Sequence, residues 1–408
     1  MFLSDSGICR SRAIVATTTS VRLTLLSHRG LRQGLPNSNQ EILLTKPTHR
    51  PVRAVVALLA LSLALTGCQG AGAHGADDGP ATPPLAEVTV VDDPRSWEGP
   101  STAVAGTTAI DPVTAGEVQL PVTVTDSQGT SVTVTDASRI LALDIYGSLS
   151  RIVFELGLGD QVIGRDISSG FPEIAGVPLV TQNGHDLNAE AMLELNPTVI
   201  LTDTSLGPWD TILQMREIGI PVVVVDSHRS IDGIGGLIAE VASALGVTER
   251  GSLLAERTQH AVAAKVAEIA AVTPADPADR LRMLFLYVRG QSGVYYLFGE
   301  ESGADTLIEA LGGIDVAGEN GWIGMRPLTA EALVAANPDV ILMMTKGLES
   351  VGGVDGLVEH IPAVAQTTAG QHRRIVDMSD TTILSFGPHT AGVLDALAVA
   401  LYAPEDAS

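Results

Sequence analysis

Apolar and polar residues follow two different periods along this chain. Between Val118 and Thr135, β-branched residues alternate with polar ones in two runs separated by Asp-Ser-Gln-Gly, which predicts a β-hairpin. Beyond it, short continuous apolar runs alternate with segments of helical period. Runs such as Pro221–Val225 are typical of parallel strands buried on both faces, so the pattern predicts an α/β fold. The expected strands are 139–143, 161–164, 198–202, 221–225 and 281–288, and the expected helices are 148–156, 189–195 and 208–217.

An internal repeat divides this pattern into two similar halves. Leu187–Leu201 reads LNAEAMLELNPTVIL and Leu328–Leu342 reads LTAEALVAANPDVIL, and nine of these fifteen positions are identical. In each copy a helix is expected to end at Asn-Pro, because proline lacks an N–H and its ring clashes with the preceding turn. Between the copies the pattern is helical, with a break near Gly246. We therefore expect an N-terminal α/β lobe with a leading hairpin over 118–230, a helical connection over 231–278 and a C-terminal α/β lobe over 279–408.

The beginning of the chain has the pattern of an export signal. The apolar run Ala54–Leu65 follows two arginines, and it is shorter than the roughly twenty residues that span a bilayer. It ends in Leu-Thr-Gly-Cys68, which resembles the bacterial lipobox, whose cysteine is lipidated and becomes the first residue of the mature protein. Residues 1–68 are therefore expected to be a signal region with lipidation at Cys68. Residues 69–117 are rich in Gly, Ala, Thr and Pro, and we expect a flexible tether there.

The first 51 residues are unusual for a signal region, because a signal rarely begins so late. No methionine occurs between Met1 and Met192, and Val52 would open a compact signal. We expect residues 1–51 to reflect an incorrectly assigned start of translation. The other cysteine, Cys9, precedes the expected cleavage point, so a mature chain that starts at Cys68 would have no disulfide.

Charge and composition restrict the possible partners. The 408 residues carry a formal net charge of −23, which excludes nucleic acid as a partner because phosphate binding needs clustered Lys and Arg. An anionic membrane surface would also repel so acidic a chain, so membrane attachment is expected to depend on the lipid. Aromatic residues make up 3% of the chain, so each one is informative about a binding site.

Together these features resemble the class III bacterial solute-binding proteins, in which two Rossmann-like α/β lobes are joined by one long, rigid helix. The resemblance covers about Leu120 to Leu401. It implies a non-enzymatic, lipid-anchored binding component of an ABC importer on the extracytoplasmic face of the cell membrane, with permease and ATPase partners. Members of the class carry haem, cobalamin, ferric siderophores or transition metals. The residues that carry the resemblance are the hairpin, Arg139–Leu143, Gly157–Asp160, the two Asn-Pro-x-Val-Ile-Leu strands and the Leu311–Gly313 turn.

Candidate ligand-binding residues follow the strands, because ligands of open α/β sheets bind beyond the carboxyl ends of the strands. Tyr287 and Arg289 end the first strand of the second lobe and are two residues apart, hence on one face. A phenolate can bind ferric haem iron, and a nearby guanidinium lowers the cost of its negative charge. In the first lobe His185 lies in a turn before the repeat helix, and imidazole is a common haem ligand.

This pairing resembles the haem-binding lipoproteins of actinobacterial haem importers, in which a His from one lobe and a Tyr from the other ligate iron and an Arg supports the Tyr. The resemblance assigns those roles to His185, Tyr287 and Arg289, with haem as the cargo. Met344 matches a further position of that family and is expected to line the haem, with core packing as the alternative. Arg326 occupies the repeat position equivalent to His185, and we expect it to line the haem pocket near the propionates.

Several alternatives remain open from the sequence. A ferric siderophore or cobalamin is the alternative cargo, and a porphyrin metal chelatase is the alternative from another functional class. A zinc or manganese carrier would need three or four convergent ligands, to which three of the histidines could contribute. His228 and His389 are rival iron ligands, Tyr295 and Tyr296 are alternatives to Tyr287, and Arg165 and Lys346 are further propionate candidates.

The permease-docking residues are not assigned by the resemblance. Many class III proteins place a Glu on a surface helix of each lobe to meet arginines of the permease. The matching positions in this sequence are Arg151 and Thr306, neither of them acidic. Glu155, Asp305 and Glu309 are close enough along a helix to substitute.

Overall fold

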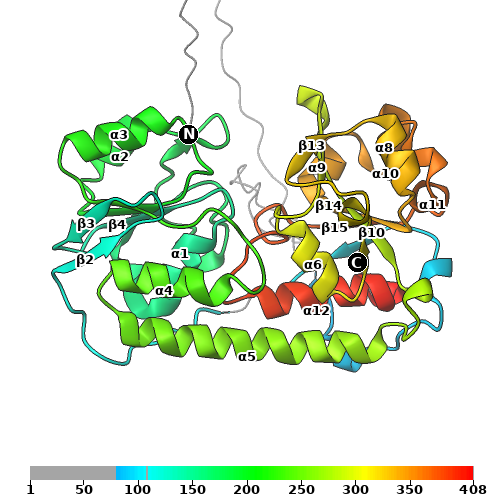
Figure 1. The fold of residues 1–408 in the computed structure, drawn as a ribbon, viewed down its shortest axis with the longest axis horizontal. Helices are drawn as coiled ribbons and strands as arrows, with labels where there is room; N and C mark the ends of the chain where they lie inside the picture. The colour runs from blue at the N-terminus through cyan, green and yellow to red at the C-terminus, as the bar shows by residue number, and fades with distance from the viewer. Residues whose placement is uncertain (1–79, 107–108, 408) are drawn as a thin grey trace, which may run out of the picture. The chain divides into compact units, whose positions relative to one another are not determined.

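Two α/β lobes, each built on a largely parallel sheet, lie side by side along one long helix (Figure 1). The computed structural model describes residues 80–106 and 109–407, all within one compact unit of the chain. The expected signal region, Val52 and Cys68 lie outside the described residues. Within the described ranges, no helix is both long and apolar enough to cross a membrane.

The first lobe contains a four-stranded parallel sheet in the order β5-β4-β8-β9. Strands β4, β8 and β9 are buried at every position, which explains why each reads as a continuous apolar run. The predicted hairpin is confirmed, since β2 and β3 pair antiparallel with Val124 opposite Val132. The bounds are β2 (Val122–Thr125), β3 (Ser131–Val134), β4 (Ile140–Leu143), α1 (Ser148–Val153), β5 (Val162–Gly164), β6 (Thr181–Gln182), β7 (Asp186–Leu187), α2 (Ala189–Glu194), β8 (Val199–Thr202), α3 (Trp209–Glu217) and β9 (Val222–Val224).

The second lobe contains a mixed sheet in the order β1-β15-β14-β10-β11-β13, with β12 also paired to β10. The strands from β1 to β10 are parallel, whereas β11 and β13 add an antiparallel edge. The bounds are β1 (Ser101–Ala103), β10 (Arg282–Arg289), β11 (Val294–Phe298), α6 (Ala304–Ala310), β12 (Ile314–Asp315), α7 (Val316–Glu319), β13 (Met325–Pro327), α8 (Ala330–Ala336), β14 (Val340–Met344), α9 (Thr345–Glu349), α10 (Gly353–His360), α11 (Thr368–Gln371), β15 (Ile375–Met378) and α12 (Thr390–Tyr402).

The helical connection breaks where the sequence predicts. Helix α4 (Ile234–Ala244) ends before Gly246, and α5 (Thr248–Val272) continues for 25 residues beneath both lobes (Figure 1). Gly246 has φ 70°, and a Cβ there would come within 2.3 Å of the Gln119 carbonyl oxygen, so a glycine is required at the turn. Helices α4 and α12 pack against α5.

Both copies of the internal repeat fold as predicted, as a short helix followed by a buried strand. Helix α2 leads to β8 and helix α8 leads to β14. At the predicted stops, Asn196 and Asn337 have φ values of 47° and 40°, the left-handed conformation in which asparagine often ends a helix.

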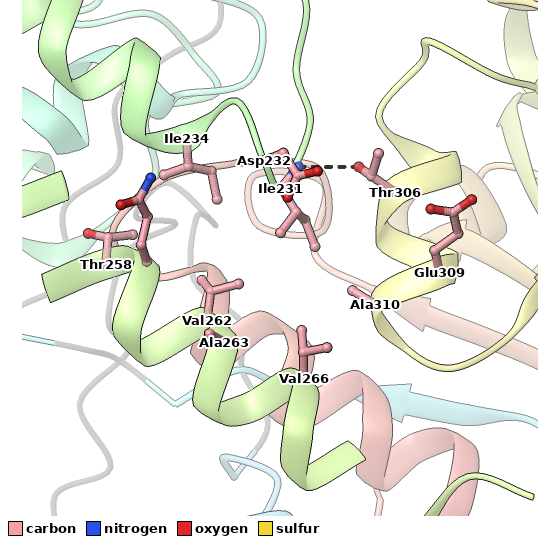
Figure 2. Close-up of a pocket in the computed structure, with 11 residues that line it drawn as sticks. Ile231, Asp232, Ile234, Thr258, Val262, Ala263, Val266, Thr306, Glu309 and Ala310 are labelled. Atoms are coloured by element: carbon pink, nitrogen blue, oxygen red, sulfur yellow. Dashed lines mark hydrogen bonds between the residues drawn. The ribbon is translucent and has the colours of Figure 1, made fainter. Parts of the chain in front are cut away.

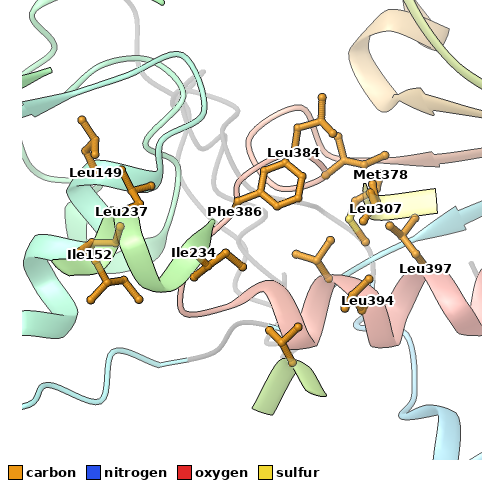
Figure 3. Close-up of a cluster of buried hydrophobic side chains, with 14 of the residues drawn as sticks. Leu149, Ile152, Ile234, Leu237, Leu307, Met378, Leu384, Phe386, Leu394 and Leu397 are labelled. Carbon is orange, nitrogen blue, oxygen red and sulfur yellow. The ribbon is translucent and has the colours of Figure 1, made fainter. Parts of the chain in front are cut away.

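One buried apolar cluster extends across the junction of the lobes (Figure 3). Leu149 and Ile152 of α1 reach it from the first lobe, and Leu394 and Leu397 of α12 reach it from the second. Phe386 lies between them and is 2% exposed. Because the lobes share this core, opening them widely would expose apolar surface.

The expected flexible tether over 69–117 is wrong for the described part of that segment. Strand β1 pairs in parallel with β15, and Leu85 and Ala103 are buried in the shared core. Further along, the Val113 N–H donates to the Glu155 carbonyl in the first lobe at 2.8 Å. The segment is therefore a strap that contacts both lobes. Its Gly- and Ala-rich composition did not predict this structure, because the partner of β1 is β15, which lies far along the chain.

Candidate functional site

Tyr287 and Arg289 lie at the carboxyl end of β10, where the Arg289 guanidinium is 4.5 Å from the centre of the Tyr287 ring. Strand alternation puts both side chains on one face, as predicted. Arg289 Nη2 also donates to Asp380 Oδ1 at 2.6 Å and approaches the Met344 sulfur at 3.7 Å. Met344, half-buried at the end of β14, thus lies beside this pair.

The register of β10, β11 and β13 decides which side chains share the Tyr287 face. Tyr287 is directly opposite Tyr296, and Tyr296 is opposite Pro327. Phe298 stacks on Tyr287 with ring centres 5.9 Å apart, and its own cross-strand partner is Met325. These residues form an apolar and aromatic wall beside Tyr287, and Met325 is 63% exposed on it.

Two candidates from the sequence lie on the opposite face of these strands. Arg326 is paired with Leu297, which belongs to the core on the other side of the sheet, so the expectation that Arg326 shares the Tyr287 pocket is wrong. Tyr295 packs against the same core, which removes it as a substitute for Tyr287. The repeat equivalence between Arg326 and His185 fails because β13 joins the edge of the main sheet through β11, whereas β7 pairs with β6 in a separate two-stranded sheet.

His185 comes from the first lobe, in the turn between β6 and β7. Burial and the Arg289 guanidinium lower the pKa of His185, and the carboxylates of Asp380 and Asp186 act against them. Arg289 and Asp380 belong to the second lobe, so His185 lies within electrostatic range of the Tyr287–Arg289 pair. Its Nδ1 is buried and has no hydrogen-bond partner among the residues that the structure describes. The structure therefore brings His185, Arg289, Tyr287 and Met344 to the same junction between lobes.

The rival histidines occupy different surroundings. His228 is exposed, with Nδ1 2.7 Å from Asp226 Oδ1. His389 precedes α12, where burial and the nearby Arg151 lower its pKa to about 3. Across 80–106 and 109–407, no three His, Cys, Asp or Glu residues are grouped to hold a metal ion.

Lys346 and Arg165 differ in their availability to a ligand. Arg165 donates to the carbonyl oxygens of Val177 and Ser169, at 3.1 and 3.3 Å, so its guanidinium holds its own loop together. Lys346 is exposed and lines a polar cavity of about 320 Å³ together with Arg289, Gln291, Ser292, Glu349 and Ser350. This cavity adjoins the Tyr287–Arg289 pair through Arg289.

The lobes touch close to this site. A Cβ added at Gly170, in the first lobe, would come within 3.0–3.1 Å of the Thr381 side chain in the second. Thr381 follows Asp380, and the first-lobe loop also presents Ile167, which is 43% exposed. Asp380 and Met325 were not predicted from the sequence, since only tertiary pairing brings them to the Tyr287–Arg289 pair.

A buried charged cluster, also missed from the sequence, supports the first-lobe side. Arg229 donates to Asp203 at 2.7 Å and to Asp144 at 3.3 Å, and its guanidinium lies 4.9 Å from the Tyr146 ring centre. Asp166 accepts from the Asp144 N–H at 3.2 Å. Burial and the neighbouring Asp144 raise the pKa of Asp166 to about 7 and that of Asp203 to about 6. The three carboxylates follow β4, β5 and β8, and therefore meet at one edge of the sheet.

A separate cavity of about 490 Å³ lies between α5, α6 and the residues that lead into α4 (Figure 2). Aliphatic side chains such as Val262 and Val266 form its wall, with Asp232 and Glu309 at its edge, and it shares no lining residue with the Tyr287 site. Thr306 lines it and accepts a hydrogen bond from the Ile231 N–H at 3.3 Å.

Arg151 and Thr306, the positions matched to the docking glutamates, therefore do not lie on the surface of the protein as expected. Thr306 lines the cavity between the lobes. Arg151 is 5% exposed and pairs with the equally buried Glu155 at 3.1 Å. Both Arg151 and Glu155 lie in the interior and cannot meet a permease.

Comparison with known proteins agrees with the fold. Residues 145–382, more than half of the chain, match the family model described as periplasmic binding protein. The haem-binding protein HmuT is 44% identical, with a TM-score of 0.72 over 76% of this chain and 99% of that chain. Structures of HmuT variants with an arginine, a histidine or a tyrosine replaced by alanine match similarly, at 42–43% identity.

Two further relatives extend this comparison. The periplasmic haem-binding protein RhuT from Roseiflexus sp. RS-1 is 36% identical, with a TM-score of 0.58 over 66% of this chain and 99% of that chain. The ABC transporter substrate-binding lipoprotein YvrC of Bacillus subtilis, itself uncharacterised, is 24% identical over 69% of this chain and 86% of its own length. These relatives are binding proteins, not enzymes. The chain belongs to the periplasmic binding protein family, with the class III fold predicted from its sequence, and it is the substrate-binding component of an ABC transporter.

Proposed function

We propose that the cargo of this protein is haem, bound between the lobes with His185 and Tyr287 as iron ligands and Arg289 supporting the tyrosine. One observation carries the proposal: a histidine of the first lobe lies within electrostatic range of an arginine that stacks on a tyrosine of the second. Two donors from opposite lobes suit a flat, iron-centred ligand, which can be coordinated on both faces. The similarity to HmuT and RhuT, both described as haem-binding, supports the same cargo.

The surroundings of the two donors favour this chemistry. The lowered pKa of His185 keeps its imidazole neutral, the form that binds a metal, and Nδ1 has no competing hydrogen bond. A phenolate at Tyr287 would gain from the adjacent positive charge of Arg289. Met344 and the wall formed by Phe298, Tyr296 and Met325 offer apolar surface to a porphyrin.

Two cations near Tyr287 and a lipid anchor complete the proposed role. Lys346 and Arg289 line a polar cavity beside Tyr287, where two cations suit the haem propionates. We further propose that lipid on Cys68 anchors the protein on the extracytoplasmic face of the membrane, from which it delivers haem to the permease. In this proposed role the protein is a carrier and not a chelatase.

Absorption spectra of the purified protein with hemin test the ligand pair. The wild type is expected to show a Soret band and a phenolate-to-iron charge-transfer band. Tyr287→Phe should abolish the charge-transfer band, His185→Ala should alter the Soret band, and each should weaken haem binding by about tenfold or more. Tyr295→Phe, on the opposite sheet face, and His228→Ala, exposed and paired with Asp226, are the matched controls and should change neither band.

The same measurements can reject the proposal in two ways. The charge-transfer band could persist in Tyr287→Phe and disappear in Tyr296→Phe. That result would assign the iron ligand to Tyr296, which lies directly across from Tyr287 on the neighbouring strand. No haem binding, together with tight binding of a ferric siderophore or cobalamin, would replace the cargo.

A further inference from the structure

Asp380, in the loop after β15, has its carboxylate fixed by two donors from different elements. Oδ1 accepts from Arg289 Nη2 at 2.6 Å, and Oδ2 accepts from the Lys346 backbone N–H at 2.9 Å, in the first turn of α9. The side chain is 13% exposed. A charge-assisted hydrogen bond in such a partly buried position is stronger than one in water.

This contact determines where the Arg289 guanidinium lies. Its other hydrogen-bonding nitrogen, Nη1, donates to the Val288 carbonyl at 2.9 Å, within the same strand, and its face lies over Tyr287. An arginine side chain has many rotamers, and fixing one of them costs conformational entropy. Asp380 is the charged partner that offsets this cost and selects the rotamer stacked on Tyr287.

Asp380 also lies where the lobes meet. The next residue, Thr381, is in close approach to Gly170 of the first lobe, and the Asp380 charge is felt by His185. Asp380 therefore belongs to the second lobe and contacts Arg289 of that lobe, but it also lies near His185 of the first lobe.

We propose that Asp380 is a positioning residue of the binding site, which holds Arg289 against Tyr287 and balances its charge before cargo arrives. The inference rests on the proposed function in one respect, that Tyr287 is the residue supported. Asp380 itself does not touch the cargo. Without its carboxylate, Arg289 leaves the Tyr287 ring and the tyrosine loses its supporting charge.

Two substitutions distinguish the positioning role of Asp380 from a purely structural role as hydrogen-bond acceptor for the α9 backbone. Asp380→Asn keeps an oxygen that can accept from the Lys346 N–H, but it removes the charge that holds Arg289. Asp380→Glu keeps the charge on a longer side chain. The pair of variants separates loss of charge at Arg289 from loss of the helix contact.

The first experiment uses ligand-free protein, so it does not depend on the identity of the cargo. In ¹⁵N NMR of the arginine side chains, the Arg289 guanidinium should be restricted and slowly exchanging in the wild type and in Asp380→Glu, and averaged in Asp380→Asn. Asp355→Asn breaks another Arg–Asp pair of the same lobe, to Arg373 at 2.7 Å, and should leave the Arg289 signals unchanged. An unchanged Arg289 in Asp380→Asn would overturn the inference.

The second experiment adds hemin. Asp380→Asn should shift the phenolate-to-iron charge-transfer band and weaken binding by about tenfold, as removal of an outer-shell partner commonly does. Asp380→Glu should keep much of the charge-transfer band and of the hemin affinity. The thermal midpoint should differ little among the wild type and the two variants. Hemin spectra and affinity unaffected by Asp380→Asn would refute the positioning role. A wild type without the charge-transfer band would instead refute the proposed tyrosine ligand, while the NMR experiment would still decide whether Asp380 holds Arg289.

Discussion

At the scale of single residues, the first lobe concentrates buried charge at the edge of its sheet. Asp144 and Asp203 share the Arg229 guanidinium, and Asp166 lies against Asp144, with all three carboxylates fully buried. One positive charge cannot balance three negative ones, so protonation is the cheapest way to reduce the repulsion. Burial, which disfavours the charged carboxylate, is the main reason why the pKa of Asp166 is raised to about 7 and that of Asp203 to about 6, and repulsion from Asp144 adds to it.

These raised values predict how stability depends on pH. The folded state holds protons on Asp166 and Asp203 that the unfolded chain, with a carboxyl pKa near 3.8, gives up at lower pH. The stability they contribute is therefore fully present below about pH 4 and lost as the pH rises through about 6 to 7, by several kcal/mol. Urea unfolding of the ligand-free protein at pH 5 and pH 8 measures this difference. Asp166→Asn should flatten the dependence, whereas Asp160→Asn, at an exposed position, should not; an equal slope in both variants would show that the cluster is not responsible.

At the scale of elements, the internal repeat gives the two lobes equivalent exposed glutamates. Glu190 of α2 and Glu331 of α8 each lie in the first turn of their helix and are exposed. The resemblance to class III proteins matches the docking positions to Arg151 and Thr306, which the fold places in the interior and in a cavity lining. Glu190 and Glu331 are the residues that the repeat itself relates across the two lobes.

We expect this pair to meet cationic residues of the permease. An exposed ion pair contributes about 0.2–1 kcal/mol, so Glu190→Gln or Glu331→Gln alone should weaken docking by up to about fivefold and the double variant by more. Stimulation of the transporter ATPase in reconstituted vesicles, measured against protein concentration and salt, reports docking. Affinity for hemin, the proposed cargo, should stay unchanged in all three. Glu256→Gln removes an exposed charge from α5 and serves as the control; if it weakened docking as much as the pair, net charge and not this surface would be the cause.

The elements also show what the sequence could and could not predict. Strands β4, β8 and β9 were predictable because burial on both faces leaves a continuous apolar run, and the Asn-Pro stops were predictable because proline acts locally. Tyr287 and Arg289 could be placed on one face for the same local reason. Arg326 could not be placed, because its face depends on pairing with β11, a partner that the repeat does not encode. Asp380 reaches Arg289 from 91 residues away along the chain, beyond any periodic pattern.

At the scale of the whole molecule, the lobes are joined by more than α5. The strap formed by residues 80–106 and 109–117 is bound to the second lobe through β1 and to the first through contacts such as the Asp111 N–H with Glu155 Oε2, at 3.2 Å. The core drawn in Figure 3 continues between the lobes. A protein joined in this way is expected to capture its cargo with small lobe movements, because larger ones would break the shared core.

A folded strap and a flexible tether predict different effects of a mutation in this segment. Leu85 is 4% exposed within the shared core, and its N–H donates to Asp395 of α12 at 3.1 Å. Leu85→Ala should lower the free energy of unfolding by about 2–3 kcal/mol, as loss of a buried leucine usually does, whereas the same change in an unstructured tether would cost almost nothing. Urea unfolding followed by circular dichroism measures the difference, with Thr89→Ala, exposed in the same segment, as the control. If both variants unfold like the wild type, the strap does not stabilise the lobes; a selective loss in Leu85→Ala means that the segment before the first lobe is part of the folded protein.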